Sequence, residues 1–508
     1  MKINKTKNAT RNVIYGTLLK AYTILIPFIF RTVMIRTIGV EYLGLNSLFT
    51  SVLQVLNLAE LGVGSAMVFS MYKPIAEDNE EQICALMQLY KKYYCIIGSI
   101  ILVIGLICTP FIPKLIHGVI PNDMNVYVLY LMNLSVTVLT YWMFAYKSSV
   151  LQAHQRHDVI SKVNILTFTF KYVLQVIALV VFHSYYIYVI ARIITQVITN
   201  LCTALASHKY YPNLNAKGIL DNDEVKSINR RIKDLFTSKL GGTIVNSADT
   251  IVISAFLGLE MLAIYQNYYY IISSIMAFIT IINSSVVAGV GNSLLTNSIE
   301  ENYKEFKVFT FLQMWIIGFC VCCFSSLFQP FMKLWMGEKL LLPYTVVILL
   351  CAVFAGVQLV QMLSVYKDAG GIWHEDRFRP LASGLANLVI NVILVNIIGI
   401  YGIVISTVLS VFCISLPWII SNVFNLIFKT ESMKQYILRM VIWFGIISAA
   451  VIITNIICAL INNDGVLFFI IKALISVIIP NLCFVLAFHR SAEYKKCIGI
   501  FKRMVHLK

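Results

Sequence analysis

The sequence predicts an all-α integral membrane protein with about 14 transmembrane helices, and three observations lead to this fold class. Of the 508 residues, 59% are hydrophobic and only 13% are charged, whereas about 25% are charged in an ordinary globular protein. The mean hydropathy is +0.80. The apolar residues form long runs, and about 20 apolar residues in a helix span the hydrocarbon of a bilayer. The composition therefore excludes the soluble classes of protein.

The apolar runs, taken in chain order, give 14 predicted spans. They lie at 12–36, 43–70, 93–115, 124–146, 161–183, 186–207, 236–257, 261–289, 307–329, 343–366, 380–398, 401–427, 436–461 and 466–488. The first run is too long for the apolar part of a signal peptide and lacks a cleavage site, so we interpret it as a retained helix. The connections predicted outside are short, which leaves no outside domain for an active site.

Basic residues are distributed unequally between the two sides of these spans. With the N-terminus inside, 31 of the 40 Lys and Arg residues lie in cytoplasmic segments and four lie outside. Cytoplasmic loops of membrane proteins are enriched in Lys and Arg. We therefore expect a multi-pass membrane protein with both termini in the cytoplasm. We interpret the net charge of +16 as a result of this asymmetry and as suited to contact with anionic membrane lipids, and not as a sign of nucleic-acid binding.

The chain contains a weak internal duplication with a period of six spans. Gly39-Val40-Glu41 recurs as Gly258-Leu259-Glu260, 219 residues later, and Tyr146-Lys147 recurs as Tyr366-Lys367, at an offset of 220. Six spans return the chain to the same side, so the repeats are parallel, as in transporters with two similar lobes. We predict an N-lobe at 1–207, a cytoplasmic linker at 208–235, a C-lobe at 236–428, and spans 13 and 14 with a basic tail at 429–508.

Several basic residues fall inside or at the ends of predicted spans, where a charge is costly unless it faces a partner or a wet cavity. We predict that five of them bind an anionic substrate: Lys20, Arg31, Lys171, Arg192 and Lys239. Glu60 and Asp249 are the only carboxylates that we place inside spans, so pairing within the spans cannot neutralise every cation. The alternative for the cations is structural pairing, or extension of the side chain to the membrane surface.

Glu60 and Asp249 are predicted ion-coupling residues, because a carboxylate in a gated cavity can exchange H⁺ or Na⁺. Either could equally be a static counter-ion. The chain has no P-loop, hydrolase or metalloprotease motif and no metal-ligand spacing. We therefore predict no catalytic residue, metal site or cofactor, and H⁺ or Na⁺ coupling of any active transport. His154 and His374 are expected to be solvated loop histidines.

Four segments resemble the Wzx-type polysaccharide flippases, a branch of the superfamily that contains MATE transporters and lipid II flippases (the MOP superfamily). They are 31–45 (RTVMIRTIGVEYLGL), 58–66 (LAELGVGSA), 249–258 (DTIVISAFLG) and 399–403 (GIYGI) with Ser406 and Thr407. The resemblance implies MATE-like lobes and alternating access. It also implies that Arg31 contacts a diphosphate and that spans 13 and 14 are the pair that lines a lipid groove in lipid II flippases.

The resemblance further implies a substrate and partners. The substrate would be undecaprenyl-diphosphate-linked oligosaccharide repeat units, moved across the membrane for capsule, O-antigen or exopolysaccharide synthesis. A polysaccharide polymerase and chain-length proteins are the implied partners. Two alternatives remain: an ion-coupled multidrug antiporter of the MATE type, which would favour acidic cavity residues, and a membrane polysaccharide polymerase, which would need a large outside loop.

Overall fold

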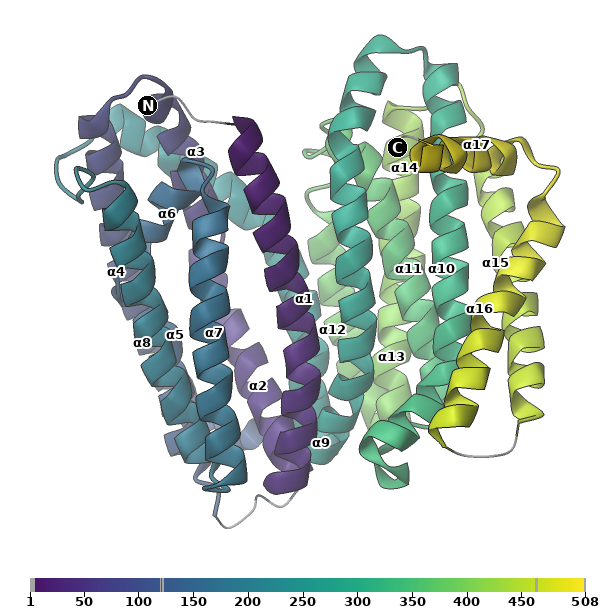
Figure 1. Cartoon of the computed structure of the whole chain (residues 1–508), viewed down its shortest axis with the longest axis horizontal. Coiled ribbons are helices and arrows are strands. Elements are labelled where there is room, and N and C mark those ends of the chain that lie inside the picture. The colour runs from purple at the N-terminus through teal and green to yellow at the C-terminus, as the bar shows by residue number, and fades with distance from the viewer. Residues whose placement is uncertain (1–4, 119, 121–122, 462–464, 507–508) are drawn as a thin grey trace. The chain divides into compact units, whose positions relative to one another are not determined.

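A computed structural model describes residues 5–118, 120, 123–461 and 465–506, and gives only the backbone for 5–10, 13–14, 234, 237–241, 244–246, 500–501 and 503–506. In these residues the secondary structure is helical throughout (Figure 1). The chain forms two compact units, Met1–Ala263 and Ile264–Lys508. The first boundary of our predicted lobes lies elsewhere, in the linker 208–235, and that division stays a prediction.

The first unit contains eight α-helices and the beginning of a ninth. Their bounds are α1 (Lys5–Thr37), α2 (Val40–Leu56), α3 (Val63–Ala76), α4 (Glu80–Cys108), α5 (Val126–Trp142), α6 (Tyr146–Ala153), α7 (His157–Val180), α8 (Tyr185–Tyr210) and α9 (Asn222–Thr296), with 3₁₀ helices η1 (Asn57–Glu60) and η2 (Thr109–Leu115). Helix α7 packs against α1 and α8, and α5 packs against α4 and α8. The predicted linker is thus largely helical, because only 211–221 separates α8 from α9.

The second unit contains the end of α9 and all later elements. They are α10 (Ile299–Met336), η3 (Glu338–Leu340), α11 (Tyr344–Ala369), α12 (Arg379–Ile398), α13 (Ile400–Leu409), the π-helix η4 (Ser410–Ser415), α14 (Leu416–Leu426), α15 (Met433–Ala459), α16 (Val466–Phe488) and α17 (Ala492–His506). Helix α10 packs against α11, α15 and α16. A capping box starts α10: Ser298 Oγ accepts from the Glu301 amide at 3.3 Å, and the Glu301 carboxylate accepts from the Ser298 amide at 3.0 Å.

The predicted spans coincide with helices. In the described residues, 11 helices are long and apolar enough to cross a membrane, or 13 if two bent pairs each form one span. These pairs are α2–η1 with α3, bent by 40°, and α5 with α6, bent by 53°. One of the 11 is the 50-residue stretch Ser247–Thr296 of α9, which is interrupted at Gly258 and corresponds to predicted spans 7 and 8. The all-helical membrane fold is confirmed.

Two glycines of the repeated motif have the same unusual backbone. Gly39 has φ 114° and ψ 162°, and Gly258 has φ 89° and ψ 175°. Positive φ is accessible to glycine because it has no Cβ. Each glycine ends one helix and is followed at once by the next, so the duplicated letters encode a duplicated turn. Gly44 serves close packing instead: a Cβ there would lie 2.1 Å from the carbonyl oxygen of Leu259.

Candidate substrate-binding and ion-coupling sites

Arg192, on α8 of the first unit, is held by two asparagine side chains from neighbouring helices. Its Nη1 donates to Oδ1 of Asn133 on α5 at 2.8 Å and to Oδ1 of Asn46 on α2 at 3.3 Å. The hydroxyl of Tyr185 donates to the same Asn46 oxygen at 3.1 Å. Amide oxygens accept hydrogen bonds but carry no net charge. These contacts therefore orient the guanidinium without neutralising it.

Lys171, on α7, is half-buried against aromatic rings. Its Nζ lies 4.3 Å from the ring centroid of Phe168 and 4.5 Å from that of Tyr172. A cation over a ring face is stabilised by the negative face of the π system. Arg192 is close enough for its charge to act on Lys171. Two cations, Lys171 and Arg192, therefore lie close together in this region of α7 and α8.

Arg31, on α1, joins the same region. The preceding residue, Phe30, is buried against Tyr172 at 4.9 Å and Tyr188 at 6.4 Å between ring centroids. The charges of both Arg31 and Arg192 act on the hydroxyl of Tyr188. Arg31 of α1 and Arg192 of α8 thus lie near one tyrosine, and Lys171 of α7 lies near Arg192. We call Arg31, Lys171 and Arg192 the cation cluster.

The other two predicted cations are not shown to belong to this cluster. Lys20 is exposed on α1, and it lies 11 positions before Arg31, which corresponds to about 16 Å along a helix. The backbone of Lys239 lies in α9, but its side chain falls outside the described residues. Their roles in substrate binding stay predictions.

Glu60 lies where a predicted span is broken. It ends the 3₁₀ helix η1 between α2 and α3, just before Gly62 with φ 91°. Its Oε1 accepts from the hydroxyl of Tyr94 at 3.2 Å, and that hydroxyl accepts from Tyr90 at 2.6 Å. Discontinuous helices of transporters often form ion sites. The position is consistent with a coupling role, which stays a prediction.

Asp249 lies in α9, in the part of that helix that belongs to the first unit. Asp249 is half-buried, and its neighbours Ala248 and Thr250 are buried. Both predicted coupling residues are therefore in the first unit, on different helices. Among the residues that the structure describes, no group of three or more His, Cys, Asp or Glu side chains could hold a metal ion.

A charged cluster that the sequence did not reveal fixes the beginning of α1. Asp158, fully buried at the start of α7, pairs with Arg156 at 2.9 Å and with Lys162 at 3.8 Å. Its backbone amide donates to Oδ1 of Asn12 on α1 at 2.8 Å, and Asn12 Nδ2 donates to the Gln155 carbonyl at 2.9 Å. These bonds attach α1, which carries Arg31, to the loop before α7.

The prediction that His154 is solvated is wrong. Its side chain is 6% exposed, with Nδ1 2.8 Å from the Val150 carbonyl and its ring 4.1 Å from that of Tyr211. Burial lowers the pKa of His154, because it disfavours the charged imidazolium. The bend between α5 and α6 folds this loop onto residues 210–214, which sequence periodicity could not indicate. His374, in contrast, is itself exposed, as predicted.

Sequence reasoning also missed the groups that organise the cation cluster. Asn133 and the tyrosines of α8 occur inside apolar runs and have no spacing that marks them as functional. The two adjacent tyrosines at the start of α8, Tyr185 and Tyr186, were the available signal, since tyrosine in a span needs a partner for its hydroxyl.

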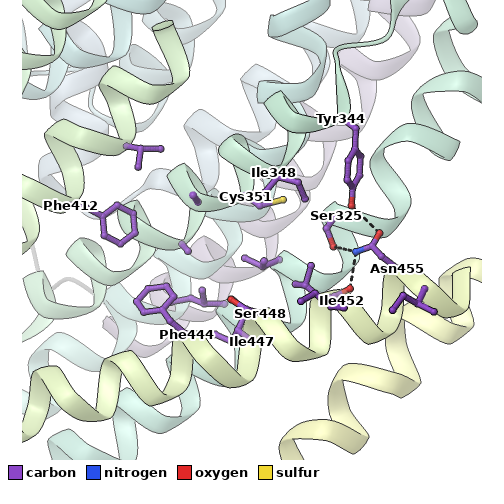
Figure 2. A pocket seen from close by; sticks show the side chains of 17 residues that line it. Ser325, Tyr344, Ile348, Cys351, Phe412, Phe444, Ile447, Ser448, Ile452 and Asn455 are labelled. Atoms are coloured by element: carbon purple, nitrogen blue, oxygen red, sulfur yellow. Dashed lines mark hydrogen bonds between the residues drawn. The ribbon is translucent and has the colours of Figure 1, made fainter. Parts of the chain in front are cut away.

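The second unit contains an apolar cavity of about 760 Å³ between α10, α11, α13, η4 and α15. Figure 2 shows mainly aliphatic and aromatic side chains on its walls, among them Phe412 and Phe444. Polar groups occur at one end, where Asn455 Nδ2 donates to Ser325 Oγ at 3.0 Å and Tyr344 donates to Asn455 Oδ1 at 3.1 Å (Figure 2). No residue of α16 lines it. Such a lining suits a hydrocarbon chain.

These observations define a multi-pass helical membrane protein with basic and acidic side chains inside its first unit. Residues 9–288 match the family model described as polysaccharide biosynthesis protein. Because the match covers more than half of the chain, the protein belongs to this family. A search among curated proteins found no relative.

Solved structures with a similar fold are transporters of the MOP superfamily. The lipid II flippase MurJ, in an inward closed conformation, aligns with a TM-score of 0.64 at 15% identity over 94% of this chain and 99% of its own. An inward-facing multidrug resistance MATE family transporter aligns at 0.59 and 14% identity, over 80% and 94%. A MOP superfamily transporter from Pyrococcus furiosus, described as having a binding pocket of reverse polarity, aligns at 0.51 and 13%, over 84% and 97%. The likeness establishes the fold.

Proposed function

We propose that the protein is a flippase that moves undecaprenyl-diphosphate-linked oligosaccharide repeat units across the bacterial cytoplasmic membrane by alternating access. Its family acts in polysaccharide biosynthesis, and its fold is that of flippases and transporters. The observation that carries the proposal is the cation cluster, in which Arg192 contacts amide oxygens and Lys171 contacts aromatic rings. Such cations suit an anionic substrate. A cation antiporter would not favour a substrate of this charge.

The cluster can replace the water that a diphosphate loses when it enters the protein. Charge-assisted hydrogen bonds from a guanidinium are stronger than those between neutral groups, and an arginine can hold two oxygens at once. Asn46 and Asn133 keep Arg192 oriented before the substrate arrives, so less entropy is lost on binding. The surrounding tyrosines offer ring faces and hydroxyls, which suit sugar rings and sugar hydroxyls.

We assign coupling to Glu60 and Asp249, with H⁺ or Na⁺ as the ion. The chain of hydroxyls from Tyr90 through Tyr94 to Glu60 supports the first assignment, because it provides polar groups beside a carboxylate at a helix break. Asp249 is supported by its half-buried position in the same unit. A polyprenyl chain would stay in hydrocarbon surroundings, and the apolar cavity of the second unit offers such surroundings.

The decisive experiment measures the leaflet in which the substrate resides. Spheroplasts that lack the protein should accumulate lipid-linked oligosaccharide on the cytoplasmic leaflet, where an added membrane-impermeant sugar-modifying enzyme cannot reach it. Expression of the wild-type chain should restore access, and expression of an Arg31→Ala chain at equal abundance should not. Equal access with and without the wild-type chain would refute the proposal, and altered drug efflux instead would favour the antiporter.

A further inference from the structure

Helix α17, at the end of the second unit, runs across the ends of the long helices instead of alongside them (Figure 1). It packs against α10. Its sequence has a single acidic residue, Glu493, and the basic residues Lys495, Lys496, Lys502 and Arg503. A short basic amphipathic helix in this orientation is typical of helices that lie in the surface plane of a membrane.

One face of α17 is fixed to the protein. The ring of Tyr494 stacks on Trp315 at 5.9 Å, and the thiol of Cys497 lies 3.9 Å from the Val308 carbonyl. Glu493 is turned to the same side, where it pairs with Arg439 at 3.1 Å. The acidic residue of the helix is therefore neutralised by the protein.

The other face of α17 is exposed and positively charged. Lys495, Lys496 and Lys502 are exposed, and so is the apolar side chain of Ile498 at 37%. Lysines beside an exposed isoleucine match both parts of a lipid surface, the phosphates and the upper ends of the chains.

A groove of about 480 Å³ lies beneath α17 and contains Lys496 in its wall. Apolar residues of α9 and α10 form much of its lining, among them Val286, Val290 and Leu312. Its other polar lining includes Glu305, whose carboxylate accepts from Ser293 at 2.8 Å. A Cβ at Gly289 would meet no atom within 4 Å, so the groove is open beside this residue. An apolar groove with a lysine at its edge matches an acyl chain joined to a phosphate.

Charge distribution identifies the membrane leaflet. The helix ends and the loop on this side of the second unit carry Lys304, Lys367, Lys429 and Lys434. The end of α10 and the segment that follows it on the opposite side carry Lys333 and Lys339. Basic loops face the cytoplasm, and the cytoplasmic leaflet is rich in anionic lipids.

We propose that α17 and the groove beneath it form a binding site for an anionic phospholipid of the cytoplasmic leaflet. One acyl chain occupies the groove beside Gly289, and the phosphate lies next to Lys496 and Lys495. The site is separate from the cation cluster and does not depend on which substrate the protein moves.

Native mass spectrometry of the full-length protein tests this site. Protein purified in detergent with equal amounts of phosphatidylglycerol and phosphatidylcholine should retain one phosphatidylglycerol in preference. Each lysine near a lipid surface contributes about a fivefold gain in binding, so Lys495→Gln with Lys496→Gln should lower phosphatidylglycerol retention roughly 20- to 30-fold. Gly289→Phe fills the groove and should lower retention of both lipids.

Matched variants separate this site from general effects of charge and bulk. Lys429→Gln with Lys434→Gln removes the same charge from the same side, and Gly445→Phe adds a ring at another glycine with open space beside it. Both should behave as wild type. Equal retention of the two lipids by the wild-type protein, equal loss in the control variants, or displacement of phosphatidylglycerol by millimolar glycerol phosphate would each overturn the proposal.

Discussion

Arg192 allows the functional and structural roles of the cation cluster to be separated. Replacement by Met removes the guanidinium but keeps an apolar side chain of similar length. The substrate then loses one charge-assisted contact, worth about 1.5–3 kcal/mol, which corresponds to a roughly 10- to 150-fold loss of binding. Because that contact is needed while the diphosphate is inside the protein, we expect transport to fall by a similar factor.

The structure also gives the expected effect on stability. Asn46 keeps Tyr185 as a donor, whereas the buried Oδ1 of Asn133 loses the Arg192 donor at 2.8 Å. An unsatisfied buried acceptor costs about 1–3 kcal/mol, whereas replacing both partners by apolar groups of similar shape is nearly neutral. Arg192→Met should therefore lower the thermal unfolding temperature, and adding Asn133→Leu should restore most of it.

The assay combines thermal unfolding of purified protein with leaflet accessibility of the lipid-linked oligosaccharide in cells. The double variant should be stable and should show the same roughly 10- to 150-fold loss of transport. Wild-type transport by a well-expressed Arg192→Met chain would refute the assignment of Arg192 to the substrate. Recovery of transport together with stability in the double variant would show that Arg192 is structural.

Four further predictions concern the other candidate residues. Arg31→Ala should abolish translocation at normal protein abundance, and Arg31→Lys should restore it only in part, because lysine lacks the planar fork; equal activity of both variants would contradict this. If Glu60 or Asp249 couples transport to an ion, Glu60→Gln or Asp249→Asn should remove the dependence of flipping on the ion gradient, and an unchanged dependence in both would place coupling elsewhere. Gly44→Ala should lower stability by about 1–3 kcal/mol through overpacking, since its Cβ would lie 2.1 Å from the Leu259 oxygen, whereas Gly16→Ala, with open space, should be neutral or stabilising in thermal unfolding. Reporter fusions after residue 462 should be external and fusions after 490 internal; two internal results would remove the last span.

The amino-acid sequence by itself determined the membrane class, the spans and the repeat. These follow from local properties: a run of apolar residues must be helical in lipid because its backbone groups have no other partners, and the glycines at 39 and 258 mark turns that need positive φ. The sequence also indicated that charges lie inside the spans, because a charged residue within a long apolar run can be read directly from the sequence.

Only the tertiary structure decided which of these charges lie together. Arg31, Lys171 and Arg192 are far apart in the chain and meet because α7 packs against both α1 and α8, while Lys20 on the same helix as Arg31 is exposed. The burial of Asp158 and His154 likewise depends on segments that are distant in sequence, α1 for Asp158 and residues 210–214 for His154. Helical periodicity specifies which face of a helix is polar, but the neighbour of that face is set by packing across the whole unit, which no local pattern contains.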